Sequence, residues 1–322
     1  LAEQAELLEV EIYPGFSASE VLFNDKNKVI GIATCDMGRL KDGSEGPNFE
    51  QGIELHSKQT IFSEGCRGHL GKTLIQKFNL NAESSPQTYG IGIKELWEIL
   101  PEKSNPGNIL HTTGWPLKSD TYGGSFLYHL DKNKISIGFV IGLDYKNPYL
   151  SPYMEFQRFK HHPDIKKILK GGRRINYGAR ALNEGGVQSL PKLTFPGGML
   201  VGCEAGFLNV PKIKGTHLAM KSGMIAASSI FENIDINEEI SNYEDEIKNS
   251  WIWSELYEVR NIRPSFKWGF WKAIVYSAID TYIFRGKAPW TIDHHGTDHE
   301  SLENKNKHEK INYPKPDNVI SF

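Results

Sequence analysis

Two stretches of the chain share one succession: an apolar strand, a glycine-rich turn and a helix. In the first, the apolar residues up to Phe62 lead into SEGCRGHLGK and a helix predicted over 70–78. In the second, Met199–Val201 precedes a glycine-rich loop, and a helix rich in small residues begins near Gly215–Thr216. Free N–H groups and the helix dipole favour negative charge or a polar ring edge at a helix start. We predict two contacts with one extended cofactor; plain strand–turn–helix packing is the alternative.

The other segments alternate between strands and helices. Near the N-terminus the pattern predicts short elements: the end of a helix over 1–10, a strand over 11–14, a hairpin over 16–34 and a polar loop over 37–51. Residues 85–180 contain strand-like runs separated by turns, which is typical of an antiparallel sheet. A helix over 153–169 is expected to be interrupted by Pro163. A charged helix is predicted over 238–258 and ends before residues 261–264.

The segment 265–285, SFKWGFWKAIVYSAIDTYIFR, is apolar and aromatic but interrupted by charges. These charges do not fall on one helical face, and the segment is too interrupted to predict a membrane span. One interpretation is a buried core helix. The other is a patch at a bilayer interface, because aromatic rings mixed with lysines suit that layer. The residues expected to contact the membrane are Phe266, Trp268, Phe270 and Trp271.

Composition narrows the possible functions. The 322 residues are enough for about two domains. A net charge of −2 argues against a dedicated nucleic-acid binder. Three widely spaced cysteines provide neither a disulfide framework nor the ligands of a four-cysteine cluster. The polar tail carries His294, His295 and His299, which suggest a solvated linker more than a metal site. Because the chain begins with Leu1, we expect it to be part of a longer protein.

Several long strings carry a family resemblance, among them TYGIGIKELWE, TYGGSFLYHL, GARALNEGGVQSLPKLTFPGG, GFLNVPKIKGTHLAMKSG and INYPKPD. These strings span nearly the whole chain. They resemble electron transfer flavoprotein–ubiquinone oxidoreductases. The family's N-terminal GxGxxG loop and its four cluster cysteines have no counterpart in these residues. The chain therefore resembles the middle of such an enzyme.

The resemblance implies an α+β or α/β fold: part of a Rossmann-like, glutathione-reductase-type FAD-binding domain with an inserted antiparallel quinone-binding sheet. It implies electron transfer from reduced electron transfer flavoprotein, through FAD and a 4Fe–4S cluster whose ligands lie outside this chain, to ubiquinone at a membrane surface. In eukaryotes that surface is the matrix side of the inner mitochondrial membrane, and in prokaryotes the cytoplasmic membrane. The expected divisions are FAD-binding segments 1–80 and 186–240, quinone sheet 81–185, membrane-surface helices 241–290 and linker 291–322.

The same resemblance suggests the flavin contacts. Glu64 and Gly65 stand where related flavoproteins have an Asp–Gly turn beside FAD. Related proteins also have Gly–Asp after the second strand, whereas this chain has Gly202 followed by Cys203, so that carboxylate contact is not transferred. N–H groups at the helix start and a nearby side-chain amide are expected to bind the pyrimidine edge of the isoalloxazine, where negative charge develops on reduction. The residues concerned are Gly206, Asn209, Gly215 and Thr216.

For the quinone, the resemblance indicates Gly123 and Gly124. Without Cβ atoms, a backbone can approach a flat ring and offer N–H groups to a quinone oxygen. Tyr122 and Phe126 are expected to line an apolar channel, and a simple bulge or turn is the alternative. Electron transfer requires no general base, nucleophile or metal ligand, so we predict no catalytic side chain and no metal site in this chain.

The sequence alone is compatible with two other functions. One is a flavoprotein that oxidises or reduces its own substrate, similar to geranylgeranyl reductases, which needs a closed pocket over the flavin. The other is a cofactor-free remnant that acts only as a docking module.

Overall fold

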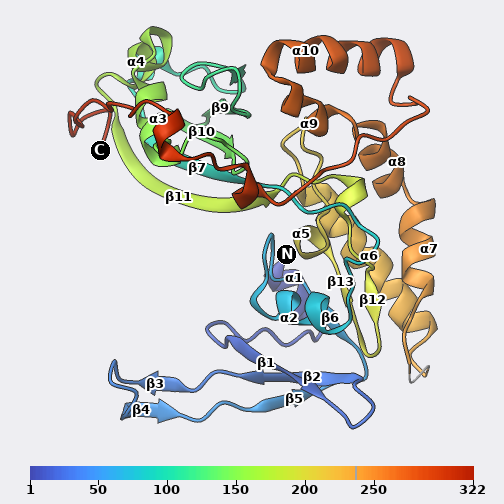
Figure 1. Cartoon of the computed structure of the whole chain (residues 1–322). Helices are drawn as coiled ribbons and strands as arrows, with labels where there is room; N and C mark the ends of the chain where they lie inside the picture. Colours follow the sequence, from blue (N-terminus) through green and yellow to red (C-terminus); the bar gives the residue numbers. More distant parts are fainter. Residues whose placement is uncertain (236–237) are drawn as a thin grey trace.

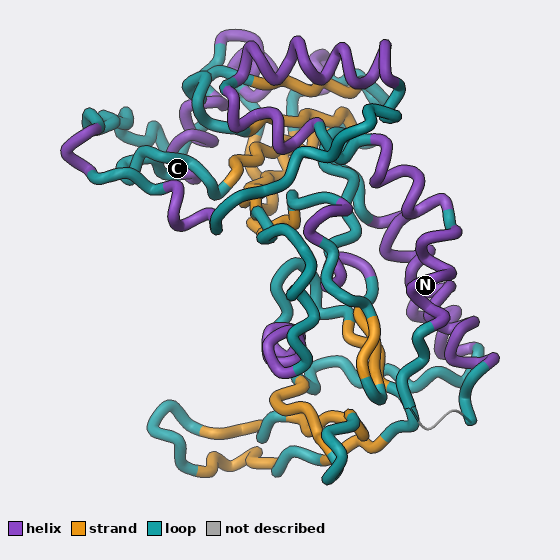
Figure 2. The backbone as a smooth tube through the Cα atoms, turned by 45° about the vertical axis from the view of Figure 1, so that its right-hand side comes forward, coloured by secondary structure: helices purple, strands orange, loops and turns teal. Residues whose placement is uncertain are grey.

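The computed structural model describes residues 1–235 and 238–322. Within these residues the strands form four separate sheets (Figure 1). The largest lies at one end of the molecule and the two sheets from residues 18–56 lie at the other, as Figure 2 also shows. The chain has two hydrophobic cores. One surrounds the strands Thr60–Phe62 and Gly198–Leu200, and the other lies beneath the largest sheet.

The two strand–glycine–helix junctions are joined by direct strand pairing. β6 (Thr60–Phe62) pairs in parallel with β13 (Gly198–Leu200), which in turn pairs with the antiparallel strand β12 (Thr194–Phe195). Phe62 lies opposite Leu200. Because parallel strands end at the same edge of a sheet, the residues that follow β6 and β13 lie side by side.

The N-terminal part contains the predicted hairpin and one that the pattern did not predict. β1 (Ala18–Phe23), β2 (Val29–Thr34) and β5 (Glu54–His56) form one sheet. The loop predicted over 37–51 is wrong: β3 (Met37–Arg39) pairs with β4 (Glu45–Glu50). This hairpin buries little on either face, so it lacks the alternation that reveals a strand.

The helix predicted at the N-terminus is present as α1 (Ala2–Leu7), which buries no residue. The strand predicted over 11–14 is absent, because these exposed residues have no partner strand.

The antiparallel sheet predicted over 85–180 is present. Its strands are β7 (Tyr89–Glu98), β8 (Ile109–Thr113), β9 (Gly123–Leu130), β10 (Lys134–Gly142) and β11 (Arg173–Asn183), in the order β11-β7-β10-β9-β8. Helix α3 (Pro152–Lys160) packs on β7 and β10. α4 (Pro163–Leu169) follows it, so Pro163 interrupts the helical run as predicted.

The remaining helices are α2 (His69–Lys77), α5 (Gly202–Ala205), α6 (Thr216–Glu232), α7 (Asn242–Asn249), α8 (Trp251–Glu258), α9 (Ile262–Ser265) and α10 (Phe270–Ala278). α5, α7 and α8 pack against α6, whereas α10 packs against α9 near the large sheet (Figure 1). The single charged helix predicted over 238–258 is two helices. Ser250 separates them, because its hydroxyl accepts a hydrogen bond from Ile252 N and caps α8.

Segment 265–285 forms α10 and a π-helical stretch, Ile279–Phe284, and is largely exposed. Only Ala273 and Asp280 are buried in these two elements, so the core-helix interpretation is wrong. In the part of the chain that is described, no helix combines the length and apolarity that crossing a membrane requires.

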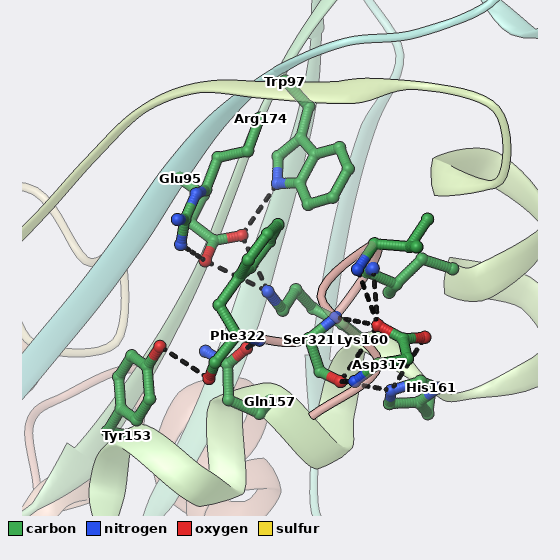
Figure 3. A network of polar contacts seen from close by, with 12 residues as sticks. Glu95, Trp97, Tyr153, Gln157, Lys160, His161, Arg174, Asp317, Ser321 and Phe322 are labelled. Atoms are coloured by element: carbon green, nitrogen blue, oxygen red, sulfur yellow. Dashed lines mark hydrogen bonds and ion pairs between the residues drawn. The ribbon is translucent and has the colours of Figure 1, made fainter. Parts of the chain in front are cut away.

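A buried charge network joins the core face of the large sheet to the C-terminal segment (Figure 3). The ammonium of Lys160 lies 3.0 Å from both carboxylate oxygens of Glu95, and neither side chain is more than 2% exposed. Trp97 Nε1 and Arg174 Nη1 donate to the same carboxylate at 2.8 Å and 3.2 Å. The Phe322 ring covers Lys160 at 5.0 Å. Burial lowers the pKa of Lys160, and Glu95 opposes that shift.

Removing Glu95 should destabilise the fold strongly. Glu95→Gln leaves a fully buried ammonium without its counter-charge, which costs about 3 kcal/mol. The double variant Glu95→Gln/Lys160→Met should regain much of that loss, because the buried ammonium is gone and Arg174, which also loses Glu95, is 22% exposed. Urea unfolding measures both. The exposed pair Arg173–Glu98 provides the control, because it joins β11 to β7 as Arg174 and Glu95 do. Glu98→Gln should cost no more than about 1 kcal/mol. Equal losses for the two Glu→Gln variants would contradict the expectation.

Candidate functional site

Glycines with left-handed backbone follow both parallel strands. Gly65 has φ +96° after β6, and Gly202 and Gly206 have φ +58° and +98° after β13. Other residues rarely adopt these angles, so the turns themselves require glycine. Val201 N donates to Phe62 O at 3.1 Å, which holds the two strand ends together. The structure thus brings Gly65 and Gly202 to one edge.

Helix α6 begins at the same edge. Its N-cap is Gly215, and no side chain caps it. Gly202 N donates to the buried Ser222 hydroxyl at 2.9 Å, so small residues of α6 allow the turn after β13 to pack closely against the helix. Thr216 is exposed at the helix start. The free N–H groups of this first turn are available to a polar ring edge or an anion.

Asn209 lies next to this helix start, but its side chain serves the loop. It is fully buried, its amide donates to Glu255 Oε1 at 2.8 Å, and its oxygen accepts from Lys212 N at 3.2 Å. His217 lies 3.0 Å from the same Glu255 oxygen. Burial favours a higher pKa for Glu255, yet the hydrogen bonds from these groups keep it low. The Asn209 amide therefore fixes the loop that precedes Gly215.

Cys66 and Cys203 lie near the strand ends and are both partly buried. Burial raises the pKa of Cys66 to about 12 and raises that of Cys203 as well. Since the thiolate is the reactive form, both act as small packed residues.

Glu64 caps a helix. Its carboxylate accepts hydrogen bonds from Leu70 N at 3.2 Å and Gly71 N at 2.7 Å, at the start of α2. A second carboxylate, Glu204 of α5, reaches the same helix start: a Cβ at Gly68 or Gly71 would overlap it. Burial, and then the charge of Glu64, raises the pKa of Glu204 from 4.5 to about 7. Sequence reasoning missed Glu204, because no local pattern places it on α2.

Glu204 should make stability pH-dependent. Its pKa is raised on folding, so its contribution is present below pH 4.5 and is lost as the pH rises through about 7. Between pH 5 and pH 8, the Tm of Glu204→Gln should therefore fall less than that of the parent chain, by about 2 °C or more. Thermal melts at the two pH values measure this difference. Glu83→Gln, at an exposed position, should match the parent; an unchanged pH profile for Glu204→Gln would contradict the assignment.

The residues expected to bind quinone lie at the start of strand β9: Tyr122 precedes the strand, and Gly123, Gly124 and Phe126 belong to it. A Cβ at Gly123 would overlap Leu117 and the Val140 carbonyl, and one at Gly124 would overlap the Thr112 carbonyl. Neighbouring strands therefore already require both glycines. The Tyr122 ring lies against Phe266 of the following helical segment, with centroids 4.7 Å apart. Phe126 covers Gly138 and stacks on Tyr128 at 4.9 Å, so the two predicted channel rings have different neighbours.

Contacts connect the large sheet with the strand-end turns. Asn183 Nδ2 donates to the Cys66 carbonyl at 3.1 Å, and a Cβ at Gly65 would meet the Arg180 guanidinium. Lys214 Nζ, from the loop before α6, donates to the Tyr128 hydroxyl of β9 at 3.1 Å. The glycine turns, the loop before α6 and the large sheet are therefore adjacent.

Of the residues expected at a membrane, two project outward: Trp268 is 48% and Trp271 73% exposed. Phe266 and Phe270 are half-buried. Other exposed apolar side chains extend this surface, and together with the two tryptophans we call them the α10 apolar face: Ile274, Val275, Ile279, Tyr282 and Ile283.

The histidine-bearing tail is not a solvated linker throughout. His294 is 3% exposed, and its Nε2 donates to the Gly185 carbonyl at 2.9 Å. Burial lowers the pKa of His294 to about 4. Asp298 accepts from Thr88 Oγ1 and Tyr89 N, which fastens this segment to β7. Among the described residues, no cluster of three or more histidine, cysteine or acidic side chains has the arrangement of a metal site.

Comparison with known proteins first defines the class. Over 87% of its length the chain superposes on a geranylgeranyl bacteriochlorophyll reductase-like protein of Thermoplasma acidophilum, with a TM-score of 0.58, 17% identity and 70% of that chain covered. A flavin-dependent brominase gives 0.56, with 16% identity and 88% and 66% of the two chains covered. The fold is that of FAD-dependent flavoenzymes.

Sequence comparison then points to one family. Residues 89–182 match the family model described as ETF-QO, ubiquinone-binding. All of the chain aligns at 58% identity with electron transfer flavoprotein-ubiquinone oxidoreductase, mitochondrial, of Sus scrofa and of Homo sapiens, covering 54% of each. The Arabidopsis thaliana relative is 53% identical, with 51% covered. The chain is similar to these enzymes along its whole length, and it spans about half the length of the relatives it matches.

Proposed function

We propose that this chain is the flavin- and quinone-binding part of an electron transfer flavoprotein–ubiquinone oxidoreductase. Electrons enter from reduced electron transfer flavoprotein and leave on ubiquinone. The observation that carries the proposal is the coincidence of the ubiquinone-binding match, residues 89–182, with the sheet Tyr89–Asn183, inside a chain 58% identical throughout to such enzymes. The likeness to a geranylgeranyl reductase-like protein concerns the fold alone.

Several features fit FAD at the edge formed by β6 and β13. The glycines at 65, 202 and 206 form left-handed turns there, and the start of α6 carries no capping side chain. FAD supplies the redox chemistry when bound. The N–H groups of Gly215 and Thr216 stabilise negative charge on the pyrimidine edge of its ring, while Asn209 keeps their loop in place. Glu64 orders the neighbouring turn by capping α2.

The remaining parts follow the same assignment. Residues 1–80 and 186–240 form the FAD-binding portion and 81–185 the quinone-binding portion, where Tyr122, Gly123, Gly124 and Phe126 receive the quinone ring. Residues 241–290 form the membrane-surface region, in which the α10 apolar face is turned to the membrane, and 291–322 lead toward a 4Fe–4S portion whose ligands lie outside this chain. Since the relatives are mitochondrial, we place the protein on the matrix side of the inner mitochondrial membrane.

Ubiquinone binding tests the proposed function directly. The purified chain should bind ubiquinone-1 saturably in equilibrium dialysis, and Phe126→Ala should weaken binding about tenfold because the ring lines the proposed channel. Phe49→Ala, which removes an aromatic ring on β4 far from this sheet, is the control. Absence of saturable binding, or equal weakening by both substitutions, would refute the quinone assignment.

Membrane attachment depends on the α10 apolar face. The variant Trp268→Ser/Trp271→Ser removes two large exposed rings, so it should float with phosphatidylcholine vesicles several-fold less than the parent chain. Tyr177→Ser removes a comparably exposed ring, 72% exposed, from β11 and should float as the parent does. Equal flotation of the tryptophan variant and the parent would exclude this face as the attachment site.

A further inference from the structure

Arg263 of α9 is almost completely buried, at 3% exposure, where three strands of the large sheet begin or end. Its Nε lies 2.9 Å from Glu184 Oε2, just beyond β11. Its Nη2 lies 2.9 Å from Asp144 Oδ1, just beyond β10. Its guanidinium stands 4.1 Å from the centroid of the Tyr122 ring, just before β9. One side chain therefore fixes three separate segments.

The sheet leaves room for this cluster. Gly90 of β7 and Gly142 of β10 are directly paired. A Cβ at Gly90 would overlap the Glu184 carboxylate, and one at Gly142 would crowd Asp144 and Arg263. Two neighbouring strands thus carry glycine where the ion cluster lies.

Arg263 and Asp144 favour each other's charged form, whereas burial raises the pKa of Glu184. Burial alone would lower the pKa of Arg263, but the carboxylates of Asp144 and Glu184 raise it above its ordinary value. Burial alone would raise the pKa of Asp144, but the charge and the hydrogen bond of Arg263 together outweigh burial and lower that pKa. A guanidinium suits this position because its planar fork reaches two carboxylates and its face stacks on an aromatic ring.

Tyr122 contacts two residues of the same helical segment. Arg263 covers its ring, and Phe266, three residues later, packs edge-on against it with centroids 4.7 Å apart. The Tyr122 carbonyl accepts a hydrogen bond from Gly142 N at 3.0 Å. Because Tyr122 directly precedes Gly123 and Gly124, any movement of its ring changes the surface beside them.

We propose that Arg263 is a positioning residue for the quinone: it fixes the Tyr122 ring beside Gly123 so that a benzoquinone head group finds a preformed wall. This inference rests on the proposed function. It adds a link between α9, which leads into the α10 apolar face, and the quinone-binding strands. Arg263 itself does not touch the quinone. Its effect passes through Tyr122.

A double-mutant cycle tests this role in the whole chain, with ubiquinone-1 as the probe in equilibrium dialysis. Arg263→Lys keeps the charge but loses the fork and the stacking, and Tyr122→Leu removes the ring. Each should raise the Kd about tenfold. The double variant should also lose about tenfold rather than a hundredfold, because both changes remove one interaction.

Arg260 is the matched control. It is also 3% exposed and lies three residues earlier, in the turn between α8 and α9. It bonds the carbonyls of Tyr257, Gly286, Ala288 and Trp290, none of which belongs to the sheet. Arg260→Lys should lower the Tm while leaving the Kd for ubiquinone-1 unchanged. Should Arg263→Lys not fold, Asp144→Asn, which removes one anchor of the guanidinium, should still raise the Kd several-fold.

The outcomes are distinct. Equal losses for Arg260→Lys and Arg263→Lys, additive losses in the cycle, or an unchanged Kd for Asp144→Asn would each overturn the positioning role while leaving quinone binding established. No saturable binding of ubiquinone-1 by the parent chain would instead refute the proposed function, and this inference with it.

Discussion

The parallel pairing of β6 with β13 is the contact on which the arrangement of the site depends. It joins residues 60–62 to residues 198–200, and the whole five-stranded sheet lies in the chain between them. Each strand is only three residues long, so its hydrogen bonds alone stabilise little. The core around them supplies the rest, since Phe62, Met199 and Leu200 are at most 3% exposed. This pairing gives the two glycine turns a common edge. Without it, Gly65 and Gly202 would be unrelated turns.

The large sheet is held by buried ions at two places. Lys160 and Glu95 meet on its core face, and Arg263 meets Glu184 and Asp144 at its end. Buried ions are costly to desolvate and compare poorly with apolar packing in net stability. Their geometric demands, however, are strict, because each lost partner leaves a charge in the interior. We therefore interpret both clusters as fixing which segments meet, with the apolar core providing most of the stability.

The sequence pattern predicted correctly those elements that neighbouring residues in the chain determine. The strand–glycine–helix junctions, the antiparallel sheet and the break at Pro163 are present as predicted. The β3–β4 hairpin was missed because its exposed faces carry no alternation, and the interruption at Ser250 because a cap depends on geometry. Residues 261–264 were interpreted only as the end of a helix, yet Arg263 bonds groups 79 and 119 positions away. Neither spacing nor composition reveals such partners.

The glycines of the candidate site have two different physical causes: packing against neighbouring strands, and a left-handed backbone. At positions 123 and 124 the neighbouring strands occupy the space a Cβ would need, so packing explains them before any ligand is considered. At 65 and 206 the positive φ is the cause, and Gly65 turns the backbone toward the sheet. Glycine content alone therefore does not indicate a binding site. The indication comes from convergence: two glycine turns, an uncapped helix start and the sheet that carries Tyr122 lie together in one region, although they are distant in sequence.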